Sequence, residues 1–125
     1  LTVQDELMTL PGVGRKVADC VALFSLDKSD AIPVDTHVWE ITIRDYAPHL
    51  STGQSLTNRI YNEITDIYKS KFGDKCGWAH SLLFTAELPE YRIKLSTELQ
   101  NNMKEFNNNR KILKSIKKSK IKNQP

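Results

Sequence analysis

The 125-residue chain has little cysteine and no long hydrophobic run. Its two cysteines, Cys20 and Cys76, lie far apart and form no C-x-x-C pair, so the cysteines predict neither a zinc site nor a redox motif. A reducing, intracellular setting is the simpler assumption. No run of about 18 apolar residues predicts a membrane span, and no signal-peptide pattern opens the chain. Because the chain starts at Leu1 rather than Met, we expect it to be a part of something longer.

The sequence also lacks the alternating apolar and polar residues of strands, and it has no internal repeat or glycine-rich linker. Apolar residues recur instead at helical spacing, which predicts an all-α fold. The length is enough for one domain with a modest core. We predict helices over residues 1–9, 15–26, 36–43 and 78–88, one from Leu56 to near Gly73, one from about Arg92, and a break over 48–53.

Acidic residues are nearly absent from positions 101–125, where Glu105 is the single acid. Eight basic residues give this segment a formal charge of +7, which leaves −4 of the total +3 for residues 1–100. Overall charge therefore gives no evidence that the folded body binds nucleic acid. We predict a domain over 1–106 and a lysine-rich tail over 107–125 that is disordered or a loosely helical extension. The tail could be a nuclear import signal, an aid to DNA affinity, or a solubilising segment.

Two glycines flank one apolar residue in Leu10-Pro11-Gly12-Val13-Gly14, between two predicted helices. This pattern predicts a helix-hairpin-helix unit. The backbone amides of Gly12, Val13 and Gly14 at a helix N-terminus can bind one DNA phosphate. The alternative is an ordinary helix–turn–helix corner that needs glycine only for its geometry.

Lys16 follows this turn, and Asp35 comes nineteen residues later in Pro33-Val34-Asp35-Thr36-His37. Most lysines are simply solvated, but a helix N-terminus disfavours an ammonium ion, and burial would act in the same direction. A partly neutral lysine can attack the anomeric carbon of a sugar and form a Schiff base. Asp35 alone is most simply a helix N-cap. Held near the sugar, it could also stabilise positive charge as the base departs, and the two roles are compatible.

His37 and His80 make only a weak case for a metal site, because neither has a carboxylate or cysteine neighbour at ligand spacing. His37 is well placed to donate to a phosphate. Trp78, Leu82, Leu83 and Phe84 are expected to be core residues of an amphipathic helix, although a flipped base would need an aromatic face.

Three segments of the chain resemble the 8-oxoguanine DNA glycosylase/AP lyase family, within the helix-hairpin-helix glycosylase superfamily. They are LPGVGRKVADCVALFSLDKSDAIPVDTHVWEI, RDYAP and GWAHSLLFTAEL, between about Leu7 and about Leu88. Endonuclease III-like proteins share LPGVGRK and VDTH but carry a four-cysteine iron–sulfur cluster further on. Only Cys76 is present there, which argues against that branch.

The resemblance implies a site and a reaction. Lys16 would be the nucleophile and Asp35 its partner, Cys20 and Phe84 would sandwich the flipped base, and His37 would contact a phosphate. The carbonyls of Met8, Leu10 and Val13 would hold a structural monovalent or calcium cation, with no organic cofactor and no iron–sulfur cluster. The chain departs from the family at His80, where the family has the glutamine that reads the base, and at Glu87, where it has aspartate. The family's β-rich N-terminal domain is absent from this chain.

These observations together predict an all-α, bifunctional enzyme of base-excision repair. It would remove 8-oxoguanine from duplex DNA and cleave the strand at the abasic site, as a nuclear, also mitochondrial, monomer that does not bind membranes. The alternatives are a non-catalytic DNA-binding module and an endonuclease III-like enzyme acting on pyrimidine lesions.

Overall fold

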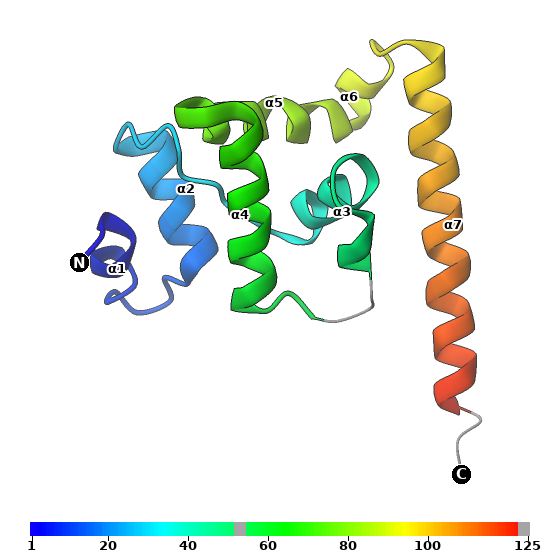
Figure 1. Cartoon of the computed structure of the whole chain (residues 1–125), viewed down its shortest axis with the longest axis horizontal. Coiled ribbons are helices and arrows are strands. Elements are labelled where there is room, and N and C mark those ends of the chain that lie inside the picture. Colours follow the sequence, from blue (N-terminus) through cyan, green and yellow to red (C-terminus); the bar gives the residue numbers. More distant parts are fainter. Residues whose placement is uncertain (52–54, 123–125) are drawn as a thin grey trace. The chain divides into compact units, whose positions relative to one another are not determined.

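The computed structural model describes residues 1–51 and 55–122, and the regular structure in these ranges is entirely helical, which confirms the all-α expectation. The chain divides into two compact units, Leu1–Thr85 and the residues from Ala86 onward. The elements in chain order are α1 (Val3–Leu7), α2 (Arg15–Ser25), α3 (Thr36–Asp45), the 3-10 helix η1 (Pro48–Ser51), α4 (Asn58–Phe72), the 3-10 helix η2 (Gly73–Lys75), α5 (Cys76–Glu87), α6 (Pro89–Arg92) and α7 (Thr97–Lys122) (Figure 1).

Side-chain caps fix where three helices of the first unit, α1, α3 and α4, begin. The Thr2 hydroxyl accepts from the Asp5 amide and the Asp5 carboxylate accepts from the Thr2 amide, a capping box that starts α1. Asp35 caps α3 and Thr57 caps α4, each through a side-chain oxygen. Leu56 therefore lies before α4 rather than inside it. Gly73, with φ of +60°, ends α4 close to the predicted position.

The core of the first unit lies between α2, α3 and α4. Its fully buried side chains include Leu23, Ile32, Val34, Val38, Ile64 and Tyr68. The loop between α2 and α3 is buried in its last part, from Ala31 through Val34. This loop delivers Asp35 to the start of α3, so the core sets the position of that carboxylate.

The buried face of α5 differs from the predicted one. Leu82 is 74% exposed and Trp78 46% exposed, while Leu83 and Phe84 are only half-buried. The helix instead buries its Cys76, Gly77 and His80 side. The reason is a close backbone approach at Gly77, whose N–H donates to the Ser29 carbonyl at 2.8 Å. A Cβ at this position would lie 2.3 Å from the Ala31 carbonyl oxygen, so only glycine fits where α5 meets the loop.

Two large apolar residues of α2 lie outside its buried face. Val17 and Phe24 are 45% and 59% exposed. The buried residues are Ala18, Asp19, Ala22 and Leu23. An aspartate thus occupies the core side of the helix.

In the second unit, α7 runs through Lys122 and so covers the described part of the lysine-rich tail. Of the two forms left open for this segment, the structure has the helical one, and residue 106, the expected domain boundary, falls inside α7. Residues 123–125 of the tail and positions 52 and 53 of the predicted break lie outside the described residues. No described helix is both long enough and apolar enough to span a membrane.

Candidate active site

Lys16 and Asp35 lie together at the starts of two helices. Lys16 is in the first turn of α2, and Asp35 is the N-cap residue of α3. The Lys16 Nζ is 3.4 Å from one oxygen of the Asp35 carboxylate. The other oxygen accepts the Val38 backbone N–H at 2.9 Å. The capping and pairing roles expected of Asp35 therefore coexist, one on each oxygen.

The surroundings of this pair keep Asp35 ionised. Partial burial raises the pKa of Asp35, but the hydrogen bond from Val38 and the positive charge of Lys16 outweigh it, so the pKa lies below its usual range. The Asp35 side chain is 19% exposed, whereas the Lys16 side chain is 53% exposed. The burial considered for Lys16 is thus not present in this chain, and Lys16 lies in the first turn of α2.

The turn between α1 and α2 has the geometry of a glycine hairpin. Gly12 has φ of +82°, a conformation that side-chain-bearing residues rarely adopt. Gly14 is the N-cap of α2 and contributes no side chain, and a Cβ at either glycine would meet nothing within 4 Å. The first amides of α2 have no acceptors inside the helix, and Gly14 provides no side-chain cap for them.

One of the three amides expected to bind phosphate is already used within the turn. The Val13 N–H donates to the Leu10 carbonyl at 3.1 Å. An anion at this hairpin would therefore be bound chiefly by the amides of Gly12, Gly14 and the first turn of α2.

A row of rings connects the surface beside Asp35 with the interior. The exposed His37 ring packs edge-on against Phe84, with centroids 6.2 Å apart. Phe84 lies against His80 at 6.4 Å, and His80 against the buried Tyr68 at 6.5 Å. Three helices, α3, α5 and α4, thus contribute to one aromatic row.

His80 is the buried polar member of this row, with 6% of the residue exposed. Burial lowers the pKa of His80, because removal from water disfavours the imidazolium. Its Nδ1 is buried without a hydrogen-bond partner among the described residues. A neutral imidazole offers one donor and one acceptor.

Cys20 follows Lys16 by one turn of α2 and is a free, partly buried thiol. Burial raises the pKa of Cys20, so the thiol form is favoured. Cys20 and Phe84 come from separate helices, α2 and α5, as two groups facing opposite sides of one base would require.

The carbonyls expected to hold a cation belong to Met8, Leu10 and Val13 in the hairpin. That of Leu10 already accepts the Val13 N–H, which leaves it a second lone pair for a metal ion. Elsewhere in residues 1–51 and 55–122, no three His, Cys, Asp or Glu side chains are grouped as metal ligands would be.

Glu87 accepts a hydrogen bond from the Arg92 guanidinium at 3.3 Å within the second unit. The sequence signalled this position only as a departure from the family pattern.

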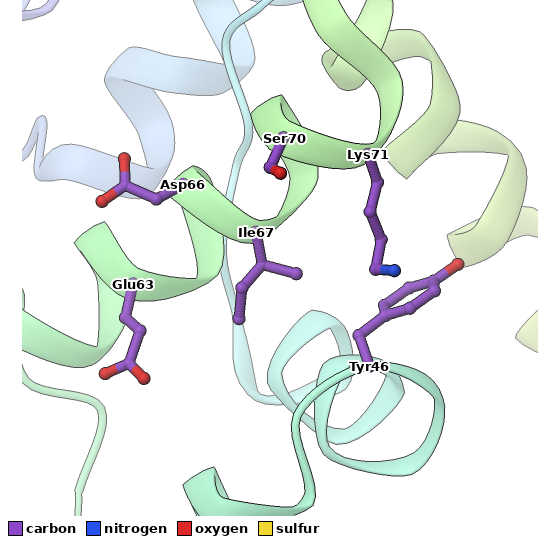
Figure 2. A pocket seen from close by; sticks show the side chains of 6 residues that line it. All are labelled: Tyr46, Glu63, Asp66, Ile67, Ser70 and Lys71. Atoms are coloured by element: carbon purple, nitrogen blue, oxygen red, sulfur yellow. The ribbon is translucent and has the colours of Figure 1, made fainter.

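Figure 2 shows a shallow hollow between the end of α3 and helix α4. Lys71 extends over the Tyr46 ring, with its Nζ 4.9 Å from the ring centre. The remaining lining residues are Glu63, Asp66, Ile67 and Ser70. None of the residues predicted for the site lines this hollow, so we do not place the reaction there.

Sequence reasoning missed two residues beside the pair. Asp19 and Tyr61 are both buried and hydrogen-bonded to one another. The available signal was an acidic residue within the stripe formed by Ala18, Ala22 and Leu23, since a buried carboxylate requires a partner.

Comparison with known proteins found one motif match and several similar proteins. Residues 4–24 match the helix-hairpin-helix motif. The chain is 50% identical over 91 residues to "N-glycosylase/DNA lyase OGG1" of Arabidopsis thaliana, covering 73% of this chain and 25% of the relative. It is 35% identical over 101 residues to "N-glycosylase/DNA lyase" of Saccharomyces cerevisiae, covering 69% and 27% respectively. The chain thus spans about a quarter of the length of these relatives.

Proposed function

We propose that this chain belongs to the helix-hairpin-helix family of DNA glycosylases and carries the lysine-bearing part of an N-glycosylase with DNA lyase activity, because residues 4–24 match the motif and the chain is 50% identical over 91 residues to an N-glycosylase/DNA lyase. The proposed substrate is duplex DNA that contains an oxidised purine, foremost 8-oxoguanine, or an abasic site. The observation that carries the proposal is the Lys16–Asp35 pair, with 3.4 Å between Nζ and the carboxylate, at the helix start that follows the hairpin.

In the proposed reaction, the neutral Lys16 amine attacks the anomeric carbon of the damaged nucleotide. The bond to the base breaks, and the base leaves with the electron pair and takes up a proton. Ring opening of the lysine adduct gives an imine, which acidifies the neighbouring sugar carbon. Loss of a proton from that carbon expels the 3′ phosphate and cleaves the strand.

Asp35 supplies negative charge in this scheme. A carboxylate with a lowered pKa is ionised at neutral pH and is a weak base, so it is better suited to stabilising an oxocarbenium-like sugar than to holding a proton. Its hydrogen bond from Val38 fixes its direction before substrate binds. The proton that Lys16 gives up before attack can pass to solvent, because the Lys16 side chain is half exposed.

The same surface offers groups for binding damaged DNA. We propose that the hairpin amides bind one phosphate and that His37 donates to another. Cys20 and Phe84 would enclose a flipped base. His80, neutral at pH 7, would present at most one donor and one acceptor to it.

Three further points belong to the proposal. A structural cation, monovalent or calcium, would be coordinated by the carbonyls of Met8, Leu10 and Val13, since hard cations prefer oxygen ligands. The lysine-rich segment of α7 would direct the protein to the nucleus. The protein would act as a monomer. A fluorescent fusion that stays nuclear without residues 109–125 would contradict the targeting role.

A second candidate is a non-catalytic DNA-binding module that retains only the hairpin. One observation favours it: the Lys16 side chain is 53% exposed. The two candidates differ in whether Lys16 forms a covalent bond with DNA.

Borohydride trapping on duplex DNA with an abasic site or 8-oxoguanine tests the function. We expect the protein in its longest natural form to give a reduced covalent adduct, because the lysine imine is an intermediate. Lys16→Gln should abolish the adduct while leaving DNA affinity within about twofold, since the hairpin amides are unchanged.

Asp35→Asn is the companion variant, because asparagine is also a good N-cap but carries no charge. It should fold normally and lower the trapping rate on 8-oxoguanine DNA by about a hundredfold. If the wild-type protein binds DNA but forms no adduct, the binding-module alternative is correct and the enzyme proposal is wrong.

A further inference from the structure

Tyr61 of α4 is in contact with the residue that precedes each member of the Lys16–Asp35 pair. Its ring lies under the guanidinium of Arg15, 3.9 Å from the ring centre. Its hydroxyl accepts the Val34 backbone N–H at 3.2 Å. One side chain from a third helix therefore touches both segments that deliver the reacting groups.

The Tyr61 hydroxyl is held by the buried carboxylate of Asp19, which is 6% exposed. The hydroxyl also lies 3.0 Å from the Ile32 carbonyl, so its one proton is shared between two acceptors, of which the carboxylate is the stronger. Burial and the Asp19 hydrogen bond raise the pKa of Tyr61, so the phenol stays protonated and keeps donating.

Asp19 connects this cluster to the hairpin. It lies on α2, three residues after Lys16, and its second oxygen accepts from the Gln4 side chain of α1 at 3.1 Å. Both oxygens of the buried carboxylate thus have donors, as burial requires. The Asp19–Tyr61 bond ties α1 and α2 to α4 and, through Val34, to the loop that ends at Asp35.

We propose that Tyr61 and Asp19 are positioning residues that set the separation and direction of Lys16 and Asp35. The inference rests on the proposed function, since it concerns the same reactive pair. Neither residue needs to touch DNA: Tyr61 is 5% exposed and acts through Arg15 and Val34. Removal of its hydroxyl frees the loop before Asp35 while the ring and its stack on Arg15 remain.

The test is Tyr61→Phe in the longest natural form of the protein, with single-turnover trapping on abasic-site DNA. Small misplacements of reacting groups reduce rates by up to about a hundredfold. We expect a tenfold or greater fall in the trapping rate at saturating protein, with the dissociation constant for DNA within about twofold of wild type.

Tyr68→Phe is the matched control. Tyr68 lies two turns further along α4 and is fully buried, and the side chain that its hydroxyl approaches is Thr42 rather than Asp19. This variant should trap abasic DNA at the wild-type rate. Asp19→Asn and the double variant complete a cycle: if both residues act through one bond, the double variant falls no further than the slower single variant.

Each outcome decides the proposal. A wild-type rate in Tyr61→Phe overturns the positioning role and leaves the proposed function intact. Loss of DNA affinity in parallel with the rate also overturns it, since the residue would then serve folding or binding alone. Absence of any adduct from wild type overturns the proposed function, and the positioning role with it.

Discussion

At the scale of single residues, His80 couples protonation to folding. It is a neutral histidine in a buried row of rings, with its Nδ1 unpartnered among the residues that the structure describes. Because its folded-state pKa lies below the ordinary value of 6.5, the unfolded chain binds a proton at higher pH than the folded one does. Stability is therefore complete above pH 6.5 and is lost as pH falls toward the folded-state pKa.

We predict that the free energy of unfolding decreases between pH 7 and pH 5, by up to about 1.4 kcal/mol for each pH unit from this group. His80→Gln should remove that part of the dependence, because an amide does not titrate in this range. Urea unfolding followed at pH 5, 6 and 7 measures it. His49→Gln is the control at an exposed position and should preserve the slope; if it flattens the slope as much as His80→Gln does, His80 is not the source.

At the scale of helices, the sequence predicted where helices form better than it predicted which face of each helix is buried. The starts of α2 and α3 followed from Gly14 and Asp35, because turn and cap chemistry is local. The buried faces did not follow: α5 is apolar on most sides, and Leu82 is exposed while Gly77 is buried. The deciding contact, between Gly77 and the loop at Ala31, joins residues 46 positions apart, which no local pattern encodes.

That contact gives a prediction for α5. Gly77→Ala should destabilise the protein by about 1–3 kcal/mol, because the new methyl group would overlap the Ala31 carbonyl oxygen, a backbone atom that cannot rotate away. Thermal unfolding measures the change. Gly14→Ala is the matched control, since a Cβ there meets nothing within 4 Å and its φ is negative. Equal stability of the two variants would mean that α5 does not approach the loop as closely as the structure has it.

At the scale of the whole chain, charge is divided unevenly along the sequence. Residues 1–100 carry −4 and residues 101–125 carry +7. The proposed reactive pair and the hairpin thus belong to an acidic body, and under the proposed function long-range attraction to DNA would come chiefly from the basic segment. Composition alone established this division.

Deletion of residues 109–125 tests that division. The deletion removes seven basic residues, so we predict weaker DNA binding and a shallower dependence of log K on log salt. Titrations between 50 and 200 mM salt on undamaged duplex DNA measure both. Deletion variants should still form the Lys16 adduct at saturating protein. An unchanged salt slope would show that the segment does not contact phosphate.

The sequence predicted the reactive groups of the candidate site but not the buried residues that hold them in place. Lys16 and Asp35 lie in contiguous motifs whose spacing is visible in the sequence. Tyr61 lies in a helix with no motif of its own, and its partner Asp19 is identified only when α2 and α4 are packed together. The pair is encoded locally, whereas the cluster that holds it depends on tertiary packing.

The late position of Tyr61 has a consequence for how the protein is made. A growing chain that has emerged only as far as residue 51 contains the hairpin, Lys16 and Asp35, but Asp19 has not yet met its hydroxyl partner. Burying that carboxylate without its hydroxyl donor is unfavourable, so we expect the segments that carry Lys16 and Asp35 to pack together only when α4 is present. The amine therefore pairs with its carboxylate only once α4 has emerged, and a shorter nascent chain carries no assembled reactive pair.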